Sequence, residues 1–479
     1  MVKFGTSGVR GLVTELTPEV VQRYVRAFLG VVSHSGVLVI GQDLRPSSSD
    51  IARSVSAAAN ALGLKVRDCG QVPTPALALA AEALGAPAIM VTGSHIPADR
   101  NGLKFYRADG EITKEDEASV QAGFERDPAP DVSPDHLDVT PHDATAPFLA
   151  RYADFFGPDA LGGLRIGVYQ HSSVARDLLM DLIRALGGGA VPLGRSRAFV
   201  PVDTEAVDPE TRALLRDWVR DNALDALVST DGDADRPMLA DASGKVVPGD
   251  ILSVPAARFI GVETIVTPVS SNTVVEATGA FRSVHRTRIG SPFVIAGMSE
   301  AASDGHDRIA GYEANGGFLL GFEAERNGRT IAPLMTRDFA LPILATLAAA
   351  KEGSMSLSAF VADLPARFVA SNRLQEVPKD ISDKLVGDLK NGVDVLPNLS
   401  SGKITRTDLT DGIRMFLADG SIVHVRPSGN APELRCYVEA GTERAATELL
   451  DDMLRHMEAY VMKRRTIRRH LARPGKNAS

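Results

Sequence analysis

The chain contains few of the residues that mark disulfide-rich, zinc-binding or membrane-spanning proteins. Only 2 of its 479 residues are cysteines, Cys69 and Cys436, and they lie far apart. This scarcity excludes a disulfide framework and a cysteine-based zinc site, and it is typical of a reducing compartment, so we expect a cytoplasmic protein. The longest apolar run, 339–350, is too short to cross a bilayer, and the first residues show no signal-peptide pattern. We therefore expect no membrane partner.

Aromatic residues are also scarce, at 5% of the chain, and acidic residues outnumber basic ones by 60 to 52. Seven of the Lys and Arg residues lie in 463–476, so the net charge of −8 combines a more acidic body with a basic tail. Nucleic-acid binding needs cations for phosphates and aromatic rings for bases, so we expect no nucleic-acid partner. We interpret the tail as a solvated helix end, with RNA or membrane binding as the alternative.

The body of the chain alternates strand-like and helix-like segments. Apolar, β-branched runs recur between segments of helical period, at 36–41, 164–170, 224–230 and 261–272. This alternation predicts βαβ units with mainly parallel sheets. A stretch rich in Pro and Asp, 127–147, predicts a linker or surface arm. The last hundred residues instead show short alternating strands before an amphipathic helix, and the length predicts about three or four domains.

The first chemical motif is VTGSHIPADRNGLKFY (91–106), which follows an apolar strand. Ser94 stands at the carboxyl end of that strand, where open α/β sheets bind their ligands. It is a candidate nucleophile, with His95 and Lys104 as proton-handling or cationic neighbours. The alternative is a serine that hydrogen-bonds its own turn. The G-x-S-x-G elbow of acyl-transfer hydrolases is absent.

The second motif is TDGDADR (230–236), which also follows a strand. Asp231, Asp233 and Asp235 alternate in a short loop and can converge on one hard cation, for which oxygen ligands favour Mg²⁺. Arg236 stands where an EF-hand loop requires glycine, which excludes that motif. The alternative is a solvated acidic turn, but three crowded carboxylates repel one another, so we favour a metal.

Two further motifs carry groups for a sugar phosphate. GYEANGGF (311–318) presents Glu313 and Asn315, which can bind hydroxyl groups, and the alternative is a plain glycine-rich turn. RPSGNAPELR (426–435) combines donors suited to a phosphate dianion, or forms a turn between two strands. These donors are Arg426, Ser428, Gly429 and Asn430. The four motifs together describe phosphoryl transfer on a phosphorylated polyol.

These motifs and FGTSGVRG (4–11) occur in the order and spacing of the α-D-phosphohexomutases, and the chain resembles this family over nearly its whole length. The resemblance implies an α/β protein with three successive α/β domains with mixed sheets, plus a C-terminal α+β domain, around a central cleft. The expected domains are 1–150 with the phosphoserine, 151–255 with the metal, 256–370 for sugar recognition, and 371–479 for phosphate binding and the basic tail.

The resemblance also implies roles for single residues. Ser94 would be the phosphoserine and, together with the three aspartates, a ligand of Mg²⁺. Arg10 would neutralise the transferred phosphoryl group, and Lys104 would be the general acid/base, with His95 beside it. The substrate-binding residues would be Arg236, Arg288, Glu313, Asn315, Arg426, Ser428, Gly429 and Asn430.

The implied reaction is an isomerisation through a hexose 1,6-bisphosphate, which also serves as activator. Phospho-Ser94 would phosphorylate a hexose 6-phosphate, and the other phosphoryl group would return to the serine. The chain departs from the family pattern at Ile96, Asn430 and Ala431, and its sugar loop reads EANGG. The absence of EQSGH counts against glucosamine phosphate. We expect interconversion of mannose 6-phosphate and mannose 1-phosphate, with glucose and glucosamine phosphates or a catalytically silent phosphosugar-binding protein as alternatives.

Overall fold

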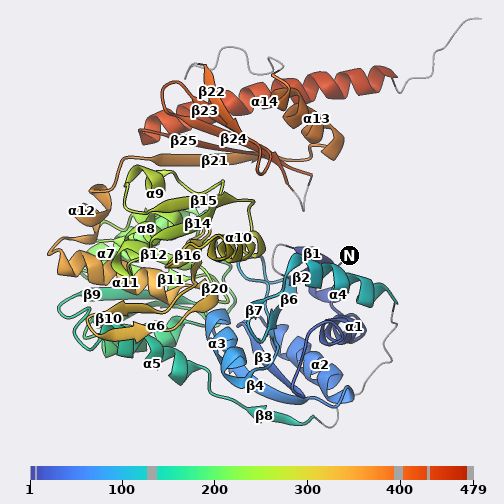
Figure 1. Ribbon diagram of the computed structural model, residues 1–479, viewed down its shortest axis with the longest axis vertical. Helices are drawn as coiled ribbons and strands as arrows, with labels where there is room; N and C mark the ends of the chain where they lie inside the picture. Colours follow the sequence, from blue (N-terminus) through green and yellow to red (C-terminus); the bar gives the residue numbers. More distant parts are fainter. Residues whose placement is uncertain (1, 6–7, 127–136, 393–402, 429–431, 472–479) are drawn as a thin grey trace, which may run out of the picture. The chain divides into compact units, whose positions relative to one another are not determined.

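The computed structural model describes residues 2–5, 8–126, 137–392, 403–428 and 432–471. The chain divides into two compact units. Unit 1 comprises 1–268, 278–285 and 290–364, and unit 2 comprises 269–277, 286–289 and 365–479. Three mixed sheets precede one antiparallel sheet along the chain (Figure 1), so the predicted fold class of successive α/β domains and a C-terminal α+β domain is confirmed.

The first sheet contains both parallel and antiparallel strands. Its strands are Lys3–Gly5 (β1), Gly8–Leu12 (β2), Val37–Gln42 (β3), Lys65–Gln71 (β4), Ala88–Val91 (β5), Arg100–Arg107 (β6), Gly110–Glu111 (β7) and Val139–Pro141 (β8). Their order is β1-β2-β6-β5-β3-β4-β8, with β7 beside β6. Strands β5, β3, β4 and β8 are parallel, whereas β6, β2 and β1 continue the sheet in antiparallel register.

The helices of this first part are Val13–Glu15 (η1), Pro18–Leu29 (α1), Ser48–Ala61 (α2), Thr74–Leu84 (α3) and Lys114–Arg126 (α4). The start of α1 illustrates how the sequence sets these bounds. Thr17 caps it by accepting the N–H of Val20, and Pro18 occupies the first turn, where no backbone donor is needed. Its buried face, including Val25 and Phe28, packs into the first core.

One prediction about this region was wrong in part, and residues 127–136 of the stretch concerned lie outside the described residues. Within the stretch 127–147, expected to be a linker or surface arm, Val139–Pro141 pairs in parallel with β4 and extends the sheet. Backbone pairing therefore outweighed the local Pro and Asp composition, because an edge strand accepts proline where no ladder bond is required.

The second and third sheets repeat the mixed plan. The second contains Arg165–His171 (β9), Gly189–Arg195 (β10), Ala226–Thr230 (β11), Pro237–Asp241 (β12) and Val246–Val247 (β13), in the order β10-β9-β11-β12-β13. The third contains Thr264–Pro268 (β14), Ser283–Thr287 (β15), Ile309–Tyr312 (β16), Phe318–Leu320 (β17) and Leu334–Asp338 (β20), in the order β15-β14-β16-β17-β20. Strands Ala324–Arg326 (β18) and Arg329–Ile331 (β19) form a hairpin.

The accompanying helices are Thr145–Phe156 (α5), Arg176–Ala185 (α6), Pro209–Asp221 (α7), Gly249–Phe259 (α8), Val274–Ala277 (α9), Ser291–Ser303 (α10), Ala340–Glu352 (α11) and Leu357–Ala362 (α12). The apolar run noted in the sequence, 339–350, forms most of α11, which is buried along nearly its whole length and packs against α8. Within the described ranges, none of the helices has an apolar stretch of the length needed to cross a membrane.

A shared feature of the three mixed sheets places the chemical motifs. In each sheet, one loop leads from a strand with a parallel neighbour into an antiparallel strand: β5 to β6, β11 to β12, and β16 to β17. Ser94 lies in the first of these loops, the three aspartates in the second, and Glu313 in the third. The carboxyl ends of the strands therefore carry all three motifs, as the sequence predicts.

Unit 2 contains the antiparallel sheet and its covering helices. The elements are Phe368–Leu374 (β21), Lys379–Lys390 (α13), Ile404–Asp408 (β22), Ile413–Leu417 (β23), Ile422–Pro427 (β24), Leu434–Ala440 (β25) and Glu443–Leu471 (α14). The strand order is β21-β25-β24-β23-β22, and α13 and α14 lie along the sheet (Figure 1). Their apolar faces, including Leu385 and Met453, bury Val425 and Cys436. The basic tail begins inside α14.

A buried hydrogen bond joins α5 to the turn before α11. The Tyr152 hydroxyl donates to Asp338 Oδ2 over 2.5 Å, and the same carboxylate accepts the N–H groups of Ala340 and Leu341. Burial raises the pKa of Asp338, although these hydrogen bonds favour its ionised form.

We expect Tyr152→Phe to lower the free energy of unfolding by about 1–3 kcal/mol, because a buried carboxylate loses a donor. Urea denaturation measures the change. Tyr169→Phe is the matched control, since Tyr169 is a buried residue whose hydroxyl makes no hydrogen bond within the described residues, and it should cost less than about 0.5 kcal/mol. Equal losses in the two variants would contradict the assignment.

Candidate active site

Ser94 occupies a strained, buried turn directly after β5. Its φ is 54°, in the left-handed region that non-glycine residues seldom adopt, and its side chain is almost fully buried. The Ser94 hydroxyl donates to Asp231 Oδ2 over 2.5 Å and lies 3.3 Å from His95 Nδ1, while the Ser94 N–H donates to Thr92 Oγ1. Such strain costs on the order of 1–3 kcal/mol, so surrounding contacts must hold the conformation.

Arg45 holds this turn in place. The side chain follows β3, is 2% exposed, and pairs through Nε with Asp43 Oδ2 at 3.0 Å. Its two Nη atoms donate to four backbone carbonyls of the loop, those of Ser94, Ile96, Pro97 and Arg100. Gly93 is required beside it, because a Cβ there would lie 2.7 Å from the Arg45 Cζ. The buried, planar guanidinium of Arg45 therefore fixes the loop through the loop's backbone carbonyls alone, and no side chain of the loop is needed for this.

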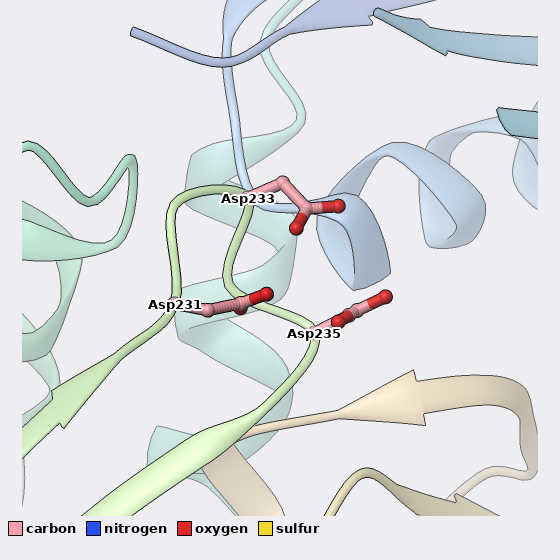
Figure 2. Close-up of side chains that lie close together, drawn as sticks. All are labelled: Asp231, Asp233 and Asp235. Atoms are coloured by element: carbon pink, nitrogen blue, oxygen red, sulfur yellow. The ribbon is translucent and has the colours of Figure 1, made fainter. Parts of the chain in front are cut away.

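The three aspartates lie on the loop between β11 and β12, and their side chains point to one side of it (Figure 2). All three are 0% exposed, and one oxygen from each lies within 4.8 Å of the others. The Oδ1 atoms of Asp231, Asp233 and Asp235 have no hydrogen-bond partner among the described residues. Three buried, unpaired carboxylate oxygens are costly unless a cation binds them, so this donor set fits a hard divalent metal ion.

The chain itself supplies part of the neutralising charge. Lys104 Nζ donates to Oδ2 of both Asp233 and Asp235, at 2.5 Å in the case of Asp233. Arg337 Nη2 lies 2.7 Å from Asp235 Oδ2, and Arg236 Nε lies 3.8 Å from Asp235 Oδ1. The repulsion expected from the sequence is therefore offset on the Oδ2 side by the protein, while the Oδ1 side stays open to a metal.

These surroundings divide the aspartates electrostatically. Burial, reinforced by the neighbouring Asp233 and Asp235, raises the pKa of Asp231 well above its usual value. Burial acts on Asp235 in the same direction, but Arg337 and Lys104 outweigh it and lower the pKa of that carboxyl. Asp235 is thus held ionised, whereas Asp231 gives up its proton less readily unless a cation arrives.

Asp233 is held by the start of α3. The Thr74 hydroxyl donates to Asp233 Oδ2 over 2.7 Å, and the Thr74 N–H donates to the Asp233 carbonyl over 2.9 Å. Asp233 makes its side-chain hydrogen bonds through Oδ2, and its Oδ1 is left without a partner among the described residues. This contact joins the first and second expected domains within unit 1.

Cationic groups surround the Ser94 hydroxyl. Burial and nearby Arg236 lower the pKa of Arg10 to about 10, which leaves Arg10 charged near neutral pH. Burial, with Arg236 again adding to it, lowers the pKa of His95 to about 3, so the imidazole is neutral there. Arg10, Arg236 and Lys104 therefore supply the positive charge of this buried region, which suits a phosphate dianion, and the neutral His95 adds none.

The third loop carries the candidate sugar-binding groups. Glu313 and Asn315 are each 5% exposed, and Glu313 Oε2 accepts from Arg337 Nη1 at 2.9 Å. Asn315 Oδ1 accepts the Gly317 N–H, which closes the loop and leaves the Asn315 amide directed at Glu313 Oε2, 3.5 Å away. The structure thus brings Glu313 and Asn315 together. Arg337 links Glu313 to Asp235, on the loop of the three aspartates.

The remaining expected residues belong to unit 2. Asp411 Oδ2 accepts from Arg426 Nη1 and from the N–H of Ile289, both at 3.2 Å, so it joins the segment carrying Arg288 to the end of β24. The Ser428 N–H donates to the Glu433 carbonyl. Gly429 and Asn430 lie outside the described residues. Within unit 2, Asp411 therefore links Arg426 to the segment that carries Arg288.

Comparison with known families decides the relationship. Four models described as the phosphoglucomutase/phosphomannomutase alpha/beta/alpha domains I, II and III and the C-terminal domain match residues 1–130, 149–244, 250–368 and 363–456. The chain belongs to the phosphoglucomutase/phosphomannomutase family. The resemblance predicted from the motifs is confirmed.

Individual relatives agree over nearly the whole length. The chain is 45% identical over 461 residues to a phosphomannomutase of Sinorhizobium fredii, covering 94% of this chain and 97% of that protein. It is 42% identical over 467 residues to a phosphomannomutase of Salmonella muenchen, covering 96% of each. The crystal structure of a phosphoglucomutase/phosphomannomutase family protein from Burkholderia thailandensis aligns with a TM-score of 0.73 at 20% identity, covering 96% of this chain and 98% of that one, which shows the shared fold.

Four residues of this family member's site were missed by sequence reasoning: Asp43, Arg45, Thr74 and Arg337. Three had a usable signal. Asp43 and Arg45 directly follow the apolar strand β3, at the edge where ligands bind, and Arg337 is a cation on β20 just before the apolar helix α11. Thr74 had none, since its role depends on a contact with a residue 159 positions away.

We expect Arg45→Met to lower catalytic activity by about 100-fold or more, because the Ser94 turn loses the side chain that fixes its position. The unfolding free energy should also fall, by about 3–5 kcal/mol, since Asp43 becomes an unpaired buried charge. Steady-state kinetics and urea denaturation measure the two effects. Arg53→Met, at an exposed arginine of the following helix α2, is the control and should change neither. Full activity in a folded Arg45→Met protein would contradict the assignment.

We expect metal binding to strengthen as pH rises. A divalent ion requires ionised Asp231, whose pKa is raised in the metal-free site, so binding should release a proton and weaken by up to about tenfold per pH unit below that pKa. Calorimetry with Mg²⁺ between about pH 6 and 8, in two buffers of different ionisation enthalpy, measures the protons released. Binding that neither releases protons nor varies with pH would refute this prediction, and Asp231→Asn should abolish the proton release.

Proposed function

We propose that this family member is a phosphomannomutase, an isomerase that interconverts mannose 6-phosphate and mannose 1-phosphate. The observation that carries the proposal is the buried Ser94 hydroxyl, bonded to Asp231 of a metal-competent triad and surrounded by cations. Relatives named phosphomannomutase at 45% and 42% identity support mannose as the sugar. The scarcity of cysteine supports a cytoplasmic location.

The first half-reaction transfers the phosphoryl group of phospho-Ser94 to the free hydroxyl of a hexose 6-phosphate. The bond between phosphorus and Ser94 Oγ breaks, a bond to the sugar oxygen forms, and the hydroxyl proton leaves to a basic group. Arg10 and Arg236 face the negative charge of the phosphoryl group. Ser94, Asp231, Asp233 and Asp235 would hold Mg²⁺, whose chemistry is to stabilise charge on phosphoryl oxygens.

Lys104 is the proposed general acid/base. Its nitrogen is held in a fixed position by two buried carboxylates, those of Asp233 and Asp235. In the second half-reaction, the other phosphoryl group of the 1,6-bisphosphate returns to Ser94 Oγ, and the sugar oxygen regains a proton. Free hexose 1,6-bisphosphate would activate the enzyme by rephosphorylating Ser94.

Sugar and phosphate recognition are assigned to the remaining groups. Glu313 and Asn315 would bind sugar hydroxyls, because each presents hydrogen-bonding atoms from a loop held by its own backbone bonds. In unit 2, Arg288, Arg426 and Ser428, together with Gly429 and Asn430, would bind the phosphate that is not transferred. Each of the four expected segments, 1–150, 151–255, 256–370 and 371–479, thus contributes one part.

We expect mannose 1-phosphate to give the highest kcat/KM among mannose, glucose and glucosamine 1-phosphates, assayed with Mg²⁺ and a hexose 1,6-bisphosphate, by about tenfold or more. If another sugar is preferred, the mannose assignment is wrong while the family chemistry stands.

The phosphoserine is tested separately. Ser94→Ala should lower kcat by about 10³-fold or more and remove the phosphorylated fraction seen in the intact mass. Ser56→Ala, a buried helical serine of α2, is the matched control and should leave both unchanged. Wild-type protein without turnover or phosphorylation would instead support a silent phosphosugar-binding protein.

A further inference from the structure

Arg337 contacts two of the three motif loops. It lies on β20, is 2% exposed, and places Nη2 2.7 Å from Asp235 Oδ2 and Nη1 2.9 Å from Glu313 Oε2. Its Nε lies 3.9 Å from Glu111 Oε1. One planar guanidinium therefore faces three carboxylates, two of which belong to the metal loop and the sugar loop.

Glu111 is held by other donors. Its Oε2 accepts from the Ser291 hydroxyl at 2.7 Å, and its Oε1 lies 3.3 Å from the Thr336 hydroxyl. Asp235 is bonded to Lys104 as well as to Arg337. Glu313 has weaker alternatives, because its other side-chain contact among the described residues is the Asn315 amide at 3.5 Å. Of the three carboxylates, Glu313 depends most on Arg337 for its orientation.

Gly317 lies directly on the stem of Arg337. A Cβ at Gly317 would stand 2.8 Å from the Arg337 Cγ and 2.9 Å from its Cβ and Cδ. The φ of Gly317 is not in the left-handed region, so glycine is required here by the close approach of a side chain and not by backbone conformation. The position of the Arg337 side chain therefore requires glycine at 317, the final residue of EANGG.

We propose that Arg337 is the positioning residue for Glu313, and that Gly317 is the residue that allows it. This inference rests on the proposed role of Glu313 in binding the sugar. Arg337 engages Oε2 and thereby directs Oε1 to the substrate as a fixed acceptor. Because the other end of the guanidinium is bonded to Asp235, the sugar-binding carboxylate is held in a set place relative to the phosphoryl-transfer loop.

Lysine cannot replace Arg337 in this arrangement. A single ammonium lacks the fork whose two Nη atoms bond two carboxylates in different directions. Loss of Arg337 leaves Glu313 free to turn toward Asn315, and this change removes a fixed acceptor for the sugar hydroxyl.

The first test compares Arg337→Met, Arg337→Lys and Glu313→Gln, using the hexose 1-phosphate that the wild-type chain turns over best. We expect each to raise KM by about tenfold or more, with a smaller change in kcat. In the Ser94→Ala background, calorimetry with the same hexose phosphate should show a matching rise in Kd. The double variant, Arg337→Met with Glu313→Gln, should have a KM no more than about threefold above that of the more impaired single variant.

The second test addresses the pairing with Gly317. Gly317→Ala should raise KM in the wild-type background, because the methyl group displaces Arg337. In an Arg337→Gly background, which removes the Cβ, Cγ and Cδ that a methyl group at Gly317 would meet, the same substitution should add less than about twofold. Arg308→Met is the matched control: this arginine adjoins β16, donates to the Gly261 carbonyl and should change stability but not KM.

The inference is overturned if Arg337→Lys restores wild-type KM and Kd, since charge alone would then suffice. It is also overturned if the losses from Arg337→Met and Glu313→Gln multiply, or if Gly317→Ala is equally harmful without Arg337. Melting temperatures separate these results from unfolding, because Arg337→Lys keeps the buried charge. Failure of the proposed function gives a different pattern, in which the wild-type chain neither binds nor converts any hexose phosphate of the panel.

Discussion

Three carboxylates buried in one short loop set the electrostatic demands on this site. Asp231, Asp233 and Asp235 are inaccessible to water, and buried anions remain ionised only where cations or donors face them. The chain meets part of this demand with Lys104 and Arg337 on the Oδ2 side, and leaves the three Oδ1 atoms unpaired. Lys104 on β6 and Arg337 on β20 thereby connect these two strands to the loop of the three aspartates within unit 1.

The three mixed sheets give these groups a common scaffold. In each sheet a loop passes from a strand with a parallel neighbour to an antiparallel strand, and each loop carries a different group: a hydroxyl at Ser94, three carboxylates at 231–235, and a carboxylate beside an amide at Glu313 and Asn315. The three sheets therefore place three chemically different groups at the same position, the loop that follows the carboxyl end of a strand. Function therefore depends on loop residues, while the strands position them.

Two buried arginines organise these loops in a similar way. Arg45 gathers four carbonyls around Ser94, and Arg337 bonds Asp235 and Glu313. In both cases a glycine of the loop lies against the arginine side chain, Gly93 against the guanidinium of Arg45 and Gly317 against the stem of Arg337. Because glycine has no side chain, each arginine can lie close to the loop backbone and hold the loop without covering its functional group.

The sequence by itself determined the strand and helix alternation, the placing of Ser94, the aspartates and Glu313 after strands, and the family. These follow from local periodicity and from motifs whose residues are adjacent in the chain. Only the tertiary structure decided that Lys104 and Arg337 neutralise the triad, that Thr74 holds Asp233, and that Val139–Pro141 joins the first sheet. Those contacts join residues more than 70 positions apart, and their energies come from burial and charge pairing that no local pattern records.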